Sequence, residues 1–107
     1  MRPIAISQTG PGQSAVIPLD YLIAPFQVGI GCKVTGTATF TVEHCYDDPF
    51  APGFTPAGAT WFPSTDFTAK TASADGGYTR PVRAIRLNVA SGSGKVDMVV
   101  LQAGTGL

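Results

Sequence analysis

Alternation of apolar and polar residues is the strongest pattern in the chain. From Phe26 to Val34 every even-numbered position is apolar, whereas the odd positions carry Gln, Gly or Lys. From 37 to 46 the even positions are again apolar or aromatic, and threonines fill most of the odd ones. This period of two is typical of strands with one buried face. Only Thr35 and Gly36 separate the two runs, so the sequence predicts that they pair as a hairpin.

The last third of the chain repeats the alternation. Residues 82–90 and 95–102 are predicted strands on either side of a tight turn at 91–94, with their regularly spaced apolar positions at Ile85, Leu87, Val89, Val96, Met98 and Val100. Val99 and Leu101 make the second face of the last strand apolar as well. A strand that is apolar on both faces is predicted to be covered on both sides.

The remaining segments are short. Strand candidates lie at 3–7 and 15–19, and Asp75-Gly76-Gly77 has the composition of a turn. Ser64 is a candidate helix N-cap, and its segment predicts at most a short helical turn near 64–71, because threonines disfavour a longer helix. About six or seven short strands in one domain, 1–107, predict an all-β fold: an antiparallel β-sandwich or a jelly-roll-like small barrel.

The amino-acid composition excludes several classes of function. Charged residues make up 13% of the 107 residues, whereas ordinary domains have about 25%. Seven basic and seven acidic residues cancel, which argues against a nucleic-acid binder and against a polybasic membrane-surface protein. A hydrophobic content of 44% is not typical of disorder. A sheet with so many apolar and so few charged residues is expected to bury part of its surface against further copies of itself.

The sequence also allows a prediction of the cellular compartment in which the protein assembles. No apolar stretch of signal-peptide length follows Arg2, and the run Met98–Leu101 is far too short to span a membrane. We therefore expect assembly in a cytoplasm, where Cys32 and Cys45 would be free thiols. Cys32 shares the apolar face of its strand and is expected to be buried. Cys45 has the opposite parity, which leaves it either exposed or facing a neighbour.

Candidate catalytic and metal-binding groups are sparse. His44 and Cys45 are adjacent to Asp47 and Asp48, but neighbouring strand residues point to opposite faces and cannot share one ion. No serine lies in a G-x-S-x-G elbow, and the Gly-Ser-Gly-Lys at 92–95 lacks the spacing of a phosphate loop. The sequence therefore predicts no enzyme, no metal and no cofactor.

A proline-rich segment at 47–63 is the most distinctive feature. It carries four large aromatic residues, Phe50, Phe54, Trp61 and Phe62, which solvated loops seldom do. We expect these side chains to pack against the body or to form an interface with another subunit; a ligand or sugar pocket is the alternative. A nearby group of arginines, Arg80, Arg83 and Arg86, is expected to pair with carboxylates of a neighbouring subunit.

Several segments carry a resemblance that spans nearly the whole chain. They are residues 2–10, 48–54, 59–62, 83–89 and 101–104. With these segments the chain resembles small virion structural proteins of tailed bacteriophages. The resemblance implies a non-enzymatic particle component within the virion: a capsid decoration (cement) protein or a head–tail or tail component. Its partners would be its own copies and other virion proteins such as the major capsid protein, with neither nucleic acid nor membrane. A carbohydrate-binding appendage module is the alternative.

Overall fold

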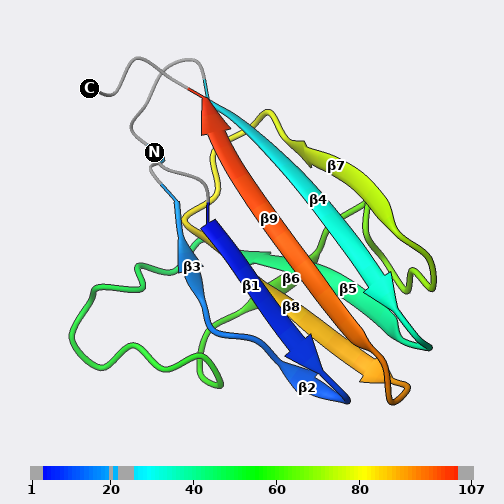
Figure 1. Ribbon diagram of the computed structural model, residues 1–107. Coiled ribbons are helices and arrows are strands. Elements are labelled where there is room, and N and C mark those ends of the chain that lie inside the picture. Colours follow the sequence, from blue (N-terminus) through cyan, green and yellow to red (C-terminus); the bar gives the residue numbers. More distant parts are fainter. Residues whose placement is uncertain (1–3, 20, 22–25, 104–107) are drawn as a thin grey trace.

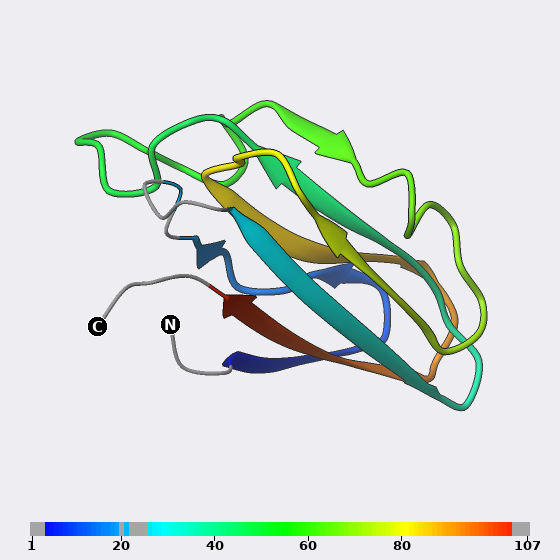
Figure 2. The ribbon, with the colours of Figure 1, turned by 90° about the horizontal axis from the view of Figure 1, so that it is seen from above.

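The computed structural model describes residues 4–19, 21 and 26–103, which form nine β-strands and no helix (Figure 1). One antiparallel sheet has the order β1 (Ile4–Thr9), β9 (Lys95–Ala103), β4 (Gln27–Thr35) and β7 (Ala74–Tyr78). The other has the order β2 (Gly12–Gln13), β8 (Ala84–Ser91), β5 (Thr39–Cys45) and β6 (Trp61–Pro63), and β3 (Ile17–Pro18) also pairs with β8. Seen from above, the sheets form two layers (Figure 2). The prediction of an all-β sandwich is confirmed.

The core lies between the two layers and is built from the alternating positions. On β5 and β8, Phe40, Val42 and Leu87 are fully buried, and on β9 so is Met98. Burial of each such side chain stabilises the fold by about 1.5–3 kcal/mol. The strand faces predicted from the alternation are therefore confirmed.

The predicted hairpin between 26–34 and 37–46 is wrong. β4 pairs with β7 and β9, whereas β5 pairs with β6 and β8, so the two strands lie in opposite sheets. Gly36, with a φ of 82°, turns the chain from one sheet to the other. The connection between β8 and β9 also changes sheet, and Gly94 N donates a 2.7 Å hydrogen bond to Thr37 O of the first connection. Alternation identifies the face of a strand that is buried, but two facing sheets satisfy it as well as a hairpin does.

A turn was predicted in two shorter segments. Asp75-Gly76-Gly77 is not a turn: it belongs to β7 and pairs with Gly31, Ile30 and Gly29 of β4. The segment near 64–71, predicted to hold at most a short helical turn, contains one turn and no helix. Phe67 N donates to Ser64 O in a single turn, and the chain then runs beside β5, where Lys70 and Phe40 exchange backbone hydrogen bonds. The fully buried Phe67 side chain holds this segment on the core.

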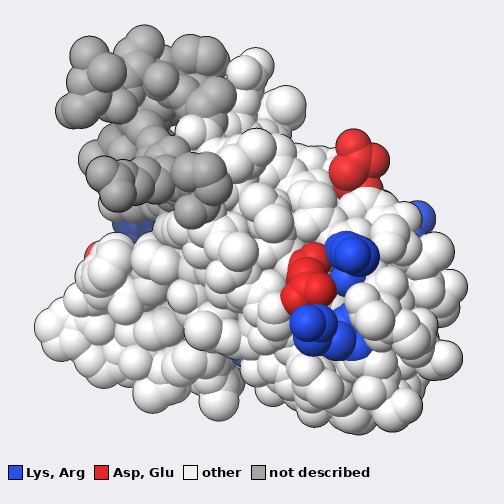
Figure 3. Space-filling view, in the orientation of Figure 1, with Lys and Arg blue, Asp and Glu red and all other residues white. Residues whose placement is uncertain are grey.

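One end of the outer face of the first sheet is apolar and open. Val99 is 42% exposed and Leu101 is 53% exposed, and both lie opposite glycines of β4 in the strand register. Charged side chains on this face gather toward one side, and most of the remaining surface is uncharged (Figure 3). The expectation that β9 is covered on both sides does not hold within this chain, because the described residues leave its outer face uncovered.

Candidate functional site

The loop between β5 and β6 projects from the body beside β3 (Figure 1). Phe50 is 79% exposed, the largest exposed fraction among the exposed large apolar side chains of the described residues. The turn that carries it is nevertheless held by hydrogen bonds. Phe50 N donates to Asp48 Oδ1 at 3.0 Å, and Ala51 N donates to Asp48 O at 3.1 Å. The phenyl ring is thus presented to solvent from a fixed turn.

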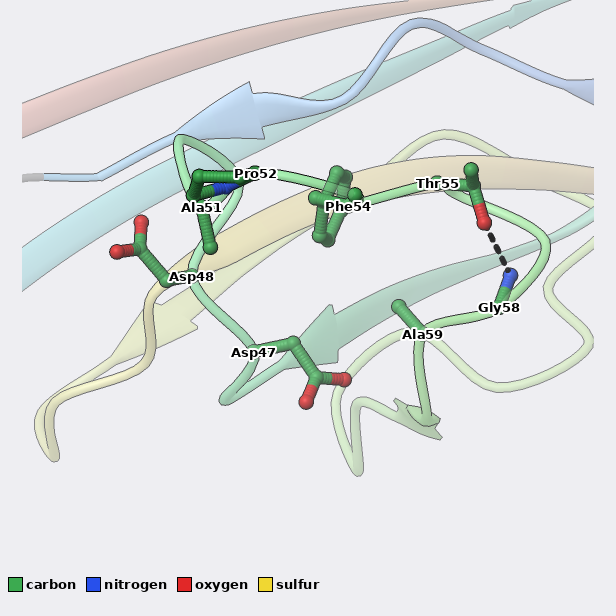
Figure 4. Close-up of a pocket in the computed structure, with 9 residues that line it drawn as sticks. Asp47, Asp48, Ala51, Pro52, Phe54, Thr55, Gly58 and Ala59 are labelled. Carbon is green, nitrogen blue, oxygen red and sulfur yellow. Dashed lines mark hydrogen bonds between the residues drawn. The ribbon is translucent and has the colours of Figure 1, made fainter.

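The base of the loop is closed by a second set of contacts. Thr60 N donates to Asp47 Oδ2 at 2.9 Å, and Trp61 Nε1 donates to Pro56 O at 2.8 Å. The loop encloses a small hollow of about 290 Å³, with Phe54 in its lining (Figure 4). Phe54 and Trp61 are half-buried. The side chains of Asp47 and Asp48 point in different directions, because each caps a different part of the loop (Figure 4).

Two of the predicted arginines bind carboxylates of their own chain. Arg83 Nη1 lies 3.6 Å from Asp48 Oδ2, and the Arg83 guanidinium stacks over Tyr21. Arg86 Nε donates to Glu43 Oε1 at 2.9 Å. The same guanidinium lies 4.2 Å from the centre of the Trp61 ring, a cation–π contact. The first pair ties the loop to the residue before β8, and the second joins β8 to β5. Partner carboxylates are therefore not needed to neutralise either arginine.

Phe62 and Arg80 lie apart from the loop contacts. The Phe62 ring stacks on His44 with centroids 5.9 Å apart and is 44% exposed. Arg80 is exposed and lies close enough to His44 to lower its pKa. The predicted site residues therefore divide into two places. Phe50 and Phe54 lie in the loop, Trp61 and Arg83 contact it, and Arg86 packs over Trp61. Phe62 and Arg80 border an open edge of the sandwich.

Buried polar side chains meet beneath that open edge. His44 Nδ1 lies 3.0 Å from the Tyr78 hydroxyl, and the Ser64 side chain lies beside Tyr78. Burial, and then the charge of Arg80, lower the pKa of His44, while burial raises the pKa of Tyr78 to about 12. Sequence reasoning missed Tyr78 as the partner of His44, and Ser64 as a neighbour of Tyr78. The only signal was a histidine on an apolar strand face, since a buried imidazole requires a hydrogen-bond partner.

Both cysteines are free thiols and both are buried. Burial raises the pKa of Cys32 to about 12 and also raises the pKa of Cys45. Cys45, whose position the alternation left open, has no exposed surface, because its outward-facing side chain lies at the base of the loop, where Sγ contacts Asp47 O. In the described part of the chain, no group of three His, Cys, Asp or Glu residues is placed to hold a metal ion.

None of the family descriptions, curated proteins or solved structures compared with this chain matches it. Within the described residues, no helix has the length and apolarity required to cross a membrane.

Proposed function

We propose that this chain is a non-enzymatic structural protein of a tailed-bacteriophage particle, a capsid decoration protein that docks on the assembled shell. The observation that carries the proposal is Phe50, which is 79% exposed on a turn fixed by Asp48. An ordered loop that presents an aromatic ring to water can bind a partner with little loss of conformational entropy. Aromatic anchors of this kind supply much of the binding energy at protein interfaces.

The surface composition supports the same proposal. Apolar side chains are exposed both on the loop and on the outer face of β9, at Phe50, Val99 and Leu101. Only 13% of the chain is charged, so few charged groups keep such a surface soluble. Binding many copies to an assembled shell, and not to its free subunits, would stabilise the shell by mass action. The resemblance of five segments to phage virion proteins supports the choice of partner.

The test compares two surface variants in a capsid-binding assay. Phe50→Ser should leave the free energy of unfolding within about 0.5 kcal/mol of wild type, because the ring is exposed. It should weaken co-sedimentation with capsids of the phage that carries the gene by about tenfold or more. Leu101→Ser removes an exposed apolar side chain from the first sheet and is the matched control for general loss of apolar surface. Equal capsid binding by wild type and Phe50→Ser would exclude the loop as the docking surface.

Trp61→Ala and Phe54→Ala are expected to weaken capsid binding by loosening the loop, with the chain still folded. If Trp61→Ala unfolds the whole protein, the loop is part of the core and the assignment is wrong. Light scattering of the protein with assembled capsids then gives the copy number. Hundreds of copies indicate shell decoration, whereas a multiple of six or twelve indicates a head–tail or tail component.

A further inference from the structure

An open pocket of about 600 Å³ lies where the two sheets separate, at the edge formed by β7. Strands β4 and β5 contribute Val28 and His44, and the turn after β6 contributes Ser64, Thr65 and Asp66. The last part of the lining is the end of β7 and the residues after it, from Gly77 to Arg80. This volume is within the range that holds a ligand of one or two rings. The pocket is separate from the hollow in the β5–β6 loop, with which it shares no lining residue.

The floor of the pocket is polar and rigid. Ser64, His44 and Tyr78 are 3%, 4% and 7% exposed. Asp66 N donates to Ser64 Oγ at 3.3 Å, Ser64 lies beside Tyr78, and Tyr78 hydrogen-bonds to His44. Each of these buried side chains has a hydrogen-bond partner, which fixes its position and makes the pocket preformed.

The rim carries groups of both charges. Arg80 is exposed, and no hydrogen bond or ion pair joins it to another described residue. Asp66 is exposed as well, and its Oδ2 accepts a hydrogen bond from Gly77 N at 3.2 Å. Thr65 and Thr79 add hydroxyl groups that both donate and accept. One carboxylate and one guanidinium cancel, so the formal charge of the rim is zero.

Two exposed aromatic rings pack against His44, which lines the pocket. The rings of Phe62 and Tyr46 are 44% and 48% exposed, and both pack against the ring of His44. We propose that this pocket binds a neutral saccharide of one or two rings. Arg80 and Asp66 would hold vicinal hydroxyl groups, and an aromatic ring beside His44 would cover the apolar face of the sugar. A free anion fits less well, because the Asp66 carboxylate would repel it.

This inference does not depend on the docking loop, and its test is separate. Uniformly 15N-labelled protein is titrated with glucose, galactose, mannose, N-acetylglucosamine, lactose and maltose up to about 50 mM, a range that detects millimolar binding. We expect at least one sugar to shift the backbone amide signals of Gly77 and Thr79 in a saturable way. Signals of the β5–β6 loop, such as Phe54, should stay unchanged.

Variants then assign the binding to the pocket. Arg80→Ala and Asp66→Asn should each weaken binding by about tenfold, the usual effect of losing a charged hydrogen bond. The amide side chain introduced by Asp66→Asn would still offer an oxygen to Gly77 N, so the fold is kept. Arg83→Ala, which removes an arginine outside the pocket, is the matched control and should bind as wild type does.

Three results would overturn the proposal. The first is the absence of a saturable shift at the pocket with any of the sugars. The second is a shift that Arg80→Ala leaves unchanged. The third is saturable binding of inorganic phosphate that Asp66→Asn strengthens, which would identify an anion site instead.

Discussion

Gly77 should be nearly irreplaceable, even by alanine. It lies in β7 opposite Gly29 of β4, and a Cβ added to it would lie only 1.9 Å from Val28 O. Real Cβ atoms essentially never approach closer than 3.0 Å, so β7 would have to move by about 1 Å. Ladder hydrogen bonds near 2.9 Å would then stretch to about 4 Å, beyond any useful length.

The loss of stability caused by Gly77→Ala follows from the number of hydrogen bonds between β7 and β4. β7 pairs with β4 over five residues, from Val28–Tyr78 to Cys32–Ala74. Losing two or three hydrogen bonds at about 1 kcal/mol each gives a destabilisation of about 2–3 kcal/mol for Gly77→Ala. That is a large part of the 5–15 kcal/mol typical of a domain, and the midpoint of urea unfolding should fall clearly.

Gly31 is the matched control for Gly77. It lies on the neighbouring strand, but a Cβ added there would have no atom within 4 Å. Its φ is not positive, so Gly31→Ala should stabilise the protein by about 0.4–1 kcal/mol by restricting the unfolded chain. If Gly77→Ala stays within about 0.5 kcal/mol of wild type, or Gly31→Ala is equally damaging, the argument from close approach is refuted.

The remaining predictions concern the core and the buried titratable groups. Phe40→Ala should cost about 3–5 kcal/mol in urea unfolding, because Phe40 is fully buried; a loss below about 1 kcal/mol would contradict its place in the core. The pKa of His44 is lowered on folding from 6.5, so the unfolded chain binds the proton more readily, and stability should fall as pH drops below about 6.5. His44→Gln should flatten that dependence, and an unchanged pH profile would rule His44 out as its source. Cys32, with its pKa raised to about 12, should react with a disulfide reagent at about pH 8 only upon unfolding; fast labelling of the folded protein would show the thiol to be accessible.

The buried face of each strand was predictable, because a strand with one buried face alternates apolar and polar residues. Phe40, Val42 and Ile85 follow the period of two and are buried as expected. This alternation does not show which strands pair with each other. Alternation along β4 and β5 is the same whether the strands share one sheet or face each other across the core, so the hairpin prediction was wrong.

The glycine-rich sequence at 75–77 led to a wrong prediction for a similar reason. Asp75-Gly76-Gly77 has the sequence of a turn, but it forms an edge strand that pairs with Gly31, Ile30 and Gly29 of β4, where Gly77 lies opposite Gly29. Close approach of two backbones depends on both strands, and one segment alone does not reveal it.

The candidate site was predicted in part. The sequence identified the aromatic loop and its arginines as one region, and Trp61 does contact Arg86. It assigned the arginines to carboxylates of another subunit, whereas Arg86 pairs with Glu43, which lies directly opposite it in the register of β5 and β8. That pairing could be inferred only once the strand order was known.

The two outer faces of the sandwich suit different contacts. Arg86, Glu43 and Trp61 lie together on the outer face of the second sheet, and the loop between β5 and β6 projects on that side (Figure 2). The first sheet instead presents Val99 and Leu101 beside glycines. Copies that stack through the first sheet would therefore leave the loop free to reach a larger particle. Under the proposed function, Leu101→Ser should then reduce self-association without loss of capsid binding, and Phe50→Ser should do the reverse. A single variant that abolished both would mean that one surface makes both contacts.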